Sequence, residues 1–285
     1  PISVLLRNGK IWYATTSYAP MDELWIVEYD PSAGTWKTIY TEKLDYWAWD
    51  QPWSEPDIAF QTLGDVTVLV LKRPDTFGLG WPDHTHIMDI RVFVGENLYS
   101  KTSFIYPGQA GVSTAFNKNV FTITQSGGVT KIVLSYVKQI SAVYPTITSE
   151  IGFKISTDLG LTWNEYMTGY ILPDNYAPKV PITYCEDTDT YYSLFSKSTW
   201  DAYLYKSIDG GITWSLVSTV TYPHGISFNY NICFIFHCFH GILALMHSTG
   251  FSMTSTDGGL TWTSISSWDT MLYGITGNNW YIGTT

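Results

Sequence analysis

One octapeptide pattern occurs three times in the second half of this 285-residue chain. Its copies begin at Ser156, Ser207 and Ser255, and each has the form S-x-D-x-G-x-T-W with Leu or Ile before the Thr. Successive copies are 51 and 48 residues apart. A motif that recurs at such a period predicts a repeat architecture, because each copy marks one supersecondary unit that stacks on its neighbours.

Each copy contains an Asp, a Gly and a Trp whose chemistry suits a tight turn. The Asp carboxylate can accept hydrogen bonds from backbone N–H groups of its own turn, and the Gly can adopt a positive φ. The Trp ring can cover the turn while its N–H finds an acceptor. We therefore expect structural roles, rather than catalytic or metal-binding ones, for Asp158, Trp163, Asp209, Trp214, Asp257 and Trp262.

The octapeptide resembles the Asp-box, or bacterial neuraminidase repeat, of sialidases and related β-propellers. This resemblance implies a propeller of four-stranded blades, in which each box lies on the face opposite the active site. A stretched copy is present at 29–36, where Asp30 and Trp36 are six positions apart instead of five. The resemblance therefore predicts architecture and says little about activity.

Runs of β-branched and aromatic residues between turn residues predict strands along the whole chain. The expected fold class is all-β, a β-propeller of four-stranded antiparallel blades that forms one domain over residues 1–285. Blades are expected at 2–41, 57–104, 112–168, 180–220 and 226–266, with two more strands at 271–277 and 280–284. We favour six blades, with five as the alternative, and no long segment has the 3.6-residue apolar period of a helix.

Composition narrows the classes of partner. A net charge of −10 disfavours nucleic acid and anionic lipid surfaces, both of which attract basic proteins. The sequence has no apolar run long enough to span a membrane and no signal-peptide pattern at its start. Its cysteines, Cys185, Cys233 and Cys238, fit either one disulfide with a free thiol or three free thiols.

Aromatic residues concentrate in the loops that enter the first strand of each blade, at the end expected to lie opposite the boxes. The segment 45–57 places three Trp among Asp, Glu and Pro, and several later loops contain a Tyr near a Pro. Sugar rings stack on aromatic faces, although the same rings could fill gaps between blades. This pattern predicts ligand-binding roles for Trp47, Trp49, Trp53, Tyr106, Tyr176, Tyr222 and Trp268.

The sialidase resemblance implies three arginines that bind the substrate carboxylate. This chain has three in total, Arg7, Arg73 and Arg91, all in its first third, and the family's Arg-Ile-Pro signature is absent. Other glycosidases need a pair of carboxylates at a set distance. If the chain is an enzyme, the candidates are Glu55, Asp57 and Asp269, with Glu150 as a further one.

Two histidine clusters, His84 with His86 and His237 with His240, lack further ligands at a zinc-site spacing. The sequence predicts no metal and no cofactor. Its leading interpretation is a non-catalytic binding propeller, either lectin-like or a receptor-recognition module, exposed outside a cell or on a virion. A glycoside hydrolase and a protein-assembly scaffold are the alternatives, and the oligomeric state is left open.

Overall fold

A computed structural model describes residues 2–16, 23–44, 57–75, 85–106, 120–141, 148–171, 180–196, 201–221, 234–247, 252–265, 270–276 and 279–284. Almost all of these residues lie in strands or in the turns between them, and one short 3-10 helix, η1, spans Glu186–Thr188. Within the described ranges, no helix is long and apolar enough to cross a membrane.

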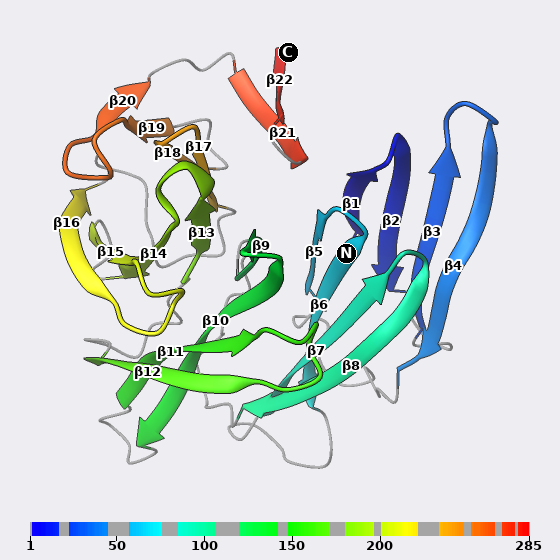
Figure 1. The fold of residues 1–285 in the computed structure, drawn as a ribbon, viewed down its shortest axis with the longest axis horizontal. Helices are drawn as coiled ribbons and strands as arrows, with labels where there is room; N and C mark the ends of the chain where they lie inside the picture. The colour runs from blue at the N-terminus through cyan, green and yellow to red at the C-terminus, as the bar shows by residue number, and fades with distance from the viewer. Residues whose placement is uncertain are drawn as a thin grey trace. The chain divides into compact units, whose positions relative to one another are not determined.

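The first two sheets come from the first third of the chain (Figure 1). The first contains β1 (Ile2–Arg7), β2 (Lys10–Thr16), β3 (Glu23–Asp30) and β4 (Thr35–Lys43). The second contains β5 (Asp57–Leu63), β6 (Val66–Asp75), β7 (Thr85–Val94) and β8 (Asn97–Tyr106).

Three more four-stranded sheets follow in chain order. The third contains β9 (Phe121–Ser126), β10 (Val129–Ser141), β11 (Thr148–Ser156) and β12 (Asn164–Ile171). The fourth contains β13 (Ile182–Cys185), β14 (Thr190–Ser196), β15 (Asp201–Ser207) and β16 (Ser215–Thr221). The fifth contains β17 (Phe234–Phe239), β18 (Ile242–His247), β19 (Ser252–Ser255) and β20 (Thr263–Ile265), and a sixth sheet has only β21 (Thr270–Thr276) and β22 (Asn279–Thr284).

Each four-stranded sheet is an antiparallel meander in which every strand pairs with the next one in sequence. Neighbouring sheets approach each other through their first strands: β1 contacts β5, and β13 contacts both β9 and β17. This arrangement is the blade of a β-propeller, so the expected all-β propeller class is confirmed. The described four-stranded sheets number five, in agreement with the five-blade alternative, and the final hairpin forms a two-stranded sheet of its own.

The structure divides into two compact units. One comprises Pro1–Gly111 with Asp158–Thr162, and the other comprises Val112–Thr157 with Trp163–Thr285. The single domain expected from the sequence stays a prediction.

In the first unit, the core lies between the facing sides of sheets one and two. Trp12, Leu24 and Ile26 from the first sheet pack with Leu69 and Phe93 from the second. These side chains alternate along their strands with residues that point to the opposite face, as the two-residue period of a strand requires. Trp12 meets Phe93 edge to face, with ring centroids 6.3 Å apart.

In the second unit, a similar core joins the third sheet to the fourth, and another joins the fourth to the fifth. A disulfide between Cys185 on β13 and Cys238 on β17 links the first strands of sheets four and five, with Cα atoms 5.2 Å apart. Both cysteines are buried. Of the two cysteine states expected from the sequence, the one with a bridge is present, and Cys233 lies outside the described residues.

Candidate functional site

Each sheet has two ends, at which its strands begin or finish. In sheet two, the tight turns at Gly64 and Gly95 lie at one end. Because the strands form a meander, the start of β5 at Asp57 and the end of β8 at Tyr106 both lie at the other end. Asp57 and Tyr106 therefore share the end of the sheet that faces away from the tight turns. Their side chains are not described, and their roles in binding or catalysis stay predictions.

The other expected ligand-binding and catalytic residues lie outside the described residues, and their roles stay predictions. They are Trp47, Trp49, Trp53, Glu55, Tyr176, Tyr222, Trp268 and Asp269. Each belongs to a segment that joins the last strand of one sheet to the first strand of the next.

The turn at 207–214 shows what the repeated octapeptide does in physical terms. Asp209 Oδ1 accepts hydrogen bonds from the Ser207 hydroxyl at 2.7 Å and from the Thr213 N–H at 2.9 Å, and its Oδ2 accepts from the Thr213 hydroxyl at 2.6 Å. The Gly211 N–H donates to Ser207 Oγ at 2.9 Å, and Trp214 Nε1 donates to Gly211 O at 3.0 Å. The polar side chains of Ser207, Asp209, Thr213 and Trp214 thus all form hydrogen bonds inside the turn itself.

The turn at 255–262 has the same hydrogen bonds. Hydrogen bonds from Thr261 and Ser255 lower the pKa of Asp257 to about 2. Burial acts to raise the pKa of Asp209, but hydrogen bonds from Thr213 and Ser207 outweigh it and bring this pKa also to about 2. Both carboxylates are therefore ionised at neutral pH and are unsuited to act as general acids.

The copy that begins at Ser156 keeps the Asp–Thr contacts, with the Thr162 N–H and hydroxyl donating to Asp158 at 2.9 and 2.6 Å. It differs at Leu159, which has a φ of 59° where the later copies have glycines, Gly210 at 78° and Gly258 at 70°. A left-handed backbone costs a residue with a Cβ about 1 kcal/mol. The Asp–Thr hydrogen bonds thus hold this turn against a local strain that glycine relieves in the later copies.

Each of these turns also contacts an earlier sheet. Thr102 Oγ1 on β8 donates to Gly160 O at 3.0 Å, and Ser218 Oγ on β16 donates to Gly259 O at 2.5 Å. In the middle copy, a Cβ added at Gly211 would lie 3.2 Å from Ile155 of sheet three. The Trp214 ring stacks on Phe153 of the same sheet at a centroid distance of 4.2 Å. The two later turns thus join neighbouring sheets of the second unit.

The stretched copy at 29–36 folds differently. Asp30 Oδ1 accepts hydrogen bonds from the Ser32 N–H and hydroxyl, at 2.9 and 2.6 Å, and from the Ala33 N–H at 3.2 Å. Trp36 does not cover this turn: its side chain is 61% exposed and lies against Tyr13 and Tyr29. The extra residue between Asp30 and Trp36 moves the ring from the turn to the surface of the sheet.

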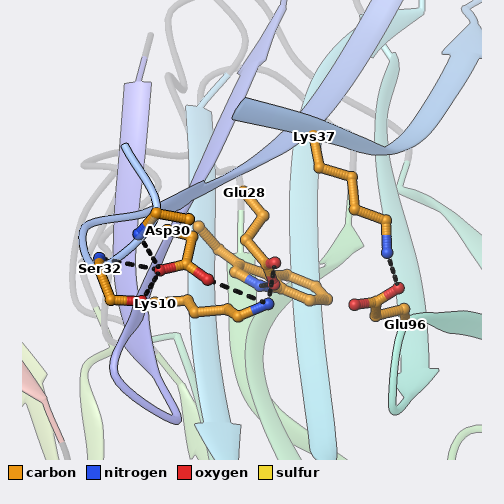
Figure 2. Close-up of polar contacts among 8 residues, drawn as sticks. Lys10, Glu28, Asp30, Ser32, Lys37 and Glu96 are labelled. Atoms are coloured by element: carbon orange, nitrogen blue, oxygen red, sulfur yellow. Dashed lines mark hydrogen bonds and ion pairs between the residues drawn. The ribbon is translucent and has the colours of Figure 1, made fainter. Parts of the chain in front are cut away.

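Figure 2 shows the polar contacts at the turn end of sheet one. Glu28, which is 4% exposed, accepts hydrogen bonds at 2.7 Å from Lys10 Nζ and from Trp12 Nε1. Burial would raise the pKa of Glu28, but these two donors lower it overall. In the same view, Lys37 pairs with Glu96 of sheet two.

Two of the three arginines are buried between sheets one and two. Arg7, 7% exposed, places its guanidinium 4.8 Å from the Trp12 ring centroid and donates from Nη2 to Asp65 O at 3.1 Å. Arg91, 0% exposed, donates from Nε to Glu42 Oε2 at 2.5 Å, and its Nη2 lies 3.9 Å from Asp89 Oδ2. Both cations are held by groups of the protein itself. Arg73 lies in β6, but its side chain is outside the description.

Glu42 is the centre of this buried ion cluster. It accepts hydrogen bonds from Arg91, from Tyr40 at 2.8 Å and from Lys101. Burial acts to raise the pKa of Glu42, yet the hydrogen bonds from Arg91 and Lys101 lower it to about 2. This cluster was not predicted from the sequence, although one signal was present: Arg91 lies two residues before Phe93 and therefore on the face of β7 that packs on sheet one.

Two further acidic residues also have structural partners. Glu150 Oε1 accepts a hydrogen bond at 2.6 Å from the N–H of Gly169, beside a register shift between β11 and β12. Hydrogen bonds from Tyr136 and from two lysines lower the pKa of Glu165 to about 2. Across the described ranges, no three His, Cys, Asp or Glu residues are grouped as metal ligands would be.

Comparison with known proteins supports the fold and goes no further. No family model matches the sequence, and no curated protein matches it. Among solved structures, the chain is similar to a protein of unknown function from Dyadobacter fermentans, with 14% identity and a TM-score of 0.57 over 99% of this chain and 92% of that one. This likeness concerns the fold alone.

Sialidase structures match more weakly. Trypanosoma rangeli sialidase has 13% identity and a TM-score of 0.47, and the match covers 89% of this chain but 46% of the sialidase. A mutant of that enzyme with trans-sialidase activity matches at 12% identity with a TM-score of 0.47. This chain therefore spans about half the length of the sialidases it matches.

Proposed function

We propose that this chain is a non-catalytic binding propeller that recognises a glycan or another surface ligand outside a cell or on a virion. In this proposal the three octapeptide turns are Asp-boxes that serve the scaffold. The ligand binds at the opposite end of the sheets, on the aromatic loops that include Trp47, Trp49 and Trp53.

The observation that carries the proposal is the placement of the arginines. A sialidase-type site needs three arginines around the substrate carboxylate, and this chain has three in total. Arg7 and Arg91 are buried in contacts with acidic residues and backbone of the first two sheets. Only Arg73 is left to bind a ligand carboxylate, so the chain lacks the three-arginine site that a sialidase uses to bind its substrate.

The acidic residues support the same conclusion. A glycosidase needs a general acid whose pKa is raised towards neutrality. In the described part of the chain, every carboxyl group with a resolved pKa shift is shifted downwards: Glu28, Asp30, Glu42, Glu165, Asp209 and Asp257. These groups are ionised acceptors inside the scaffold.

A glycan array with the purified protein tests the proposal. We expect specific hits that are lost in Trp49→Ala or Trp53→Ala without loss of folding. Tyr99→Ala is the matched control, because this exposed ring lies on β8 near the tight turns at the other end of sheet two. Binding that survives both Trp substitutions would place the site elsewhere.

Incubation of the same glycans with the protein, followed by measurement of released reducing sugar, tests the enzyme alternative. Steady release that is abolished by Glu55→Gln or Asp57→Asn would overturn the non-catalytic proposal. If no glycan binds and a protein partner is captured instead, the scaffold alternative replaces it.

A further inference from the structure

Two cysteines lie inside the core that joins sheets four and five. Cys185 on β13 is 3% exposed and Cys238 on β17 is 6% exposed, and both pack in one cluster with Leu204, Phe236 and Leu243. Burial among these apolar side chains keeps water and dissolved thiols away from the disulfide. A reaction at this disulfide therefore needs the core to open first.

The bridge is the covalent part of the contact between the two sheets. It joins the first strands of sheets four and five, which also contact each other directly. Beside the bridge, the Cys238 N–H donates a hydrogen bond to Thr183 Oγ1 at 3.0 Å inside the core. The two cysteines are 53 positions apart, and the chain between them includes β14, β15 and β16. The bridge thus closes a loop that contains most of sheet four and fixes sheet five to it.

Formation and cleavage of the bridge both require access to a sulfur atom. A disulfide exchanges when a thiolate attacks one of its sulfur atoms and forms a mixed disulfide. To form the bridge, the two cysteine thiols give two protons and two electrons to an oxidant such as glutathione disulfide, which becomes two glutathione thiols. Reduction is the reverse reaction, in which a dithiol such as dithiothreitol is oxidised to its own disulfide. Neither reagent reaches the sulfur atoms while the core is packed.

We propose that the Cys185–Cys238 disulfide is a redox lock on the packing of sheet five against sheet four. The bridge forms before or while the two sheets pack, and the packed core then shields it from thiols. Its reduction requires the sheets to separate. Loss of the bridge in turn makes separation more frequent, because the link no longer restricts the freedom of the separated state. This proposal does not depend on the proposed glycan site, which lies at the ends of the sheets.

The redox lock ties the stability of the second unit to the redox state of its surroundings. Disulfides form and persist outside cells and in secretory compartments, whereas glutathione and thioredoxin keep thiols reduced in the cytosol. A chain that folds among reduced thiols would pack sheet five on sheet four without the covalent link. We therefore expect the oxidised protein, and not the reduced one, to be the stable form.

A count of free thiols tests whether the bridge forms. The protein is exported to the bacterial periplasm, purified without reductant and treated with a maleimide in concentrated urea, and the adducts are counted by mass spectrometry. Because the chain has three cysteines and two of them form the bridge, one adduct per chain is expected before reduction and three after it.

The rate of reduction tests whether the core shields the bridge. Dithiothreitol is added to the native protein, and samples are quenched with the maleimide at increasing times. Reduction should be at least about a hundredfold slower than in concentrated urea, because exchange occurs only in the small population of molecules whose core is open.

Two glycine variants test which contact must open. Gly259 lies against Leu204 of sheet four, and an added Cβ would collide with that side chain, so Gly259→Ala should speed reduction at least about tenfold. Gly128→Ala is the matched control, because Gly128 has a similarly positive φ but lies in a turn of sheet three with no neighbour within 4 Å. It should change the rate by less than about threefold, since separation of sheets four and five leaves sheet three in place.

Three results would overturn the proposal. Three adducts in urea before reduction would show that no bridge forms. Reduction of the native protein as fast as in urea would show that the core does not shield the bridge, whatever the variants do. Equal acceleration by Gly259→Ala and Gly128→Ala would show that unfolding of the whole unit, and not separation of sheets four and five, exposes the disulfide.

Discussion

Substitution of Arg91 by Met should lower the free energy of unfolding more than substitution of any other single charged residue in the first unit. Arg91 is fully buried and lies between two carboxylates, Glu42 at 2.5 Å and Asp89 at 3.9 Å. In Arg91→Met the two acids would face each other without the cation between them. Asp89 is 1% exposed, so solvent cannot replace the lost charge.

The magnitude follows from the burial of the pair. Breaking a buried ion pair by removal of one partner costs about 3–5 kcal/mol. The fall in the pKa of Glu42, from 4.5 to about 2, corresponds to about 3 kcal/mol at neutral pH before any discount for solvent. Since the Glu42 side chain is 15% exposed and Lys101 and Tyr40 also bind it, Arg91 accounts for only part of that amount. The rest of the expected loss comes from Asp89.

The sign of the pH dependence is fixed by the direction of the shift. Because the pKa of Glu42 is lowered in the folded protein, its contribution is complete above about pH 4.5 and is lost as the pH falls towards 2. The difference in stability between wild type and Arg91→Met should therefore be constant between pH 6 and 8 and should shrink in acid.

Urea denaturation at pH 7, followed by circular dichroism, measures the effect. Lys37→Met is the control, because it breaks an ion pair whose side chains are 58% and 42% exposed and should cost less than about 1 kcal/mol. Adding Asp89→Asn to Arg91→Met should recover part of the loss, since the second change removes the orphaned charge. A cost below about 1 kcal/mol for Arg91→Met, or no recovery in the double variant, would refute this account.

Three further predictions concern the disulfide and the octapeptide turns. Replacing Cys185 and Cys238 together by Ser opens a link between residues 53 positions apart and should lower the free energy of unfolding by about 4 kcal/mol, measured by denaturation with and without dithiothreitol. Gly259→Ala should lower the free energy of unfolding by more than about 2 kcal/mol, because the added Cβ would collide with Leu204 of sheet four. Gly128→Ala, with a similar positive φ and no neighbour within 4 Å, should cost only about 1 kcal/mol in the same assay. Between about pH 4 and pH 2 the Asp209→Asn variant should lose less thermal stability than the wild type. The pKa of Asp209 is lowered in the folded protein, so the wild type loses the stabilising contribution of this carboxylate in that range.

The strands could be predicted closely from sequence because their signal is local. The blades expected at 57–104 and 180–220 are found as the sheets that run from β5 to β8 and from β13 to β16, since turn residues bound each run of β-branched and aromatic side chains. The number of four-stranded sheets was harder to predict, because it depends on which strands pair with each other and not on where each strand begins. Our preference for six rested on the hairpin of β21 and β22, which pairs with no third strand among the described residues.

The buried charges could not be predicted in the same way. Arg7 and Arg91 each lie two positions from a core residue, Leu5 and Phe93, and so on the core-facing side of their strands, which indicates burial but names no partner. Their partners, Asp65 and Glu42, are 58 and 49 residues away and come from the neighbouring sheet. Only the packing of one sheet on the next determines such pairs, and the aromatic loops that we expect to bind ligand depend on the same kind of long-range placement.

The structural roles of the motif residues limit which parts of the chain can change to suit a ligand. Its Asp, Ser and Thr are used inside the turn, and its Trp and Gly are used against the neighbouring sheet, where Trp214 stacks on Phe153 and Gly259 lies against Leu204. A change at the Gly or the Trp of the motif therefore alters how neighbouring sheets pack. The pairing of β5 with β6 and of β7 with β8 is fixed by tight turns at one end of the sheet, so a ligand contact at the opposite end need not alter it. Binding residues are commonly found on loops that a rigid scaffold positions, which is why we expect specificity to lie in the aromatic segments and not in the repeated motif.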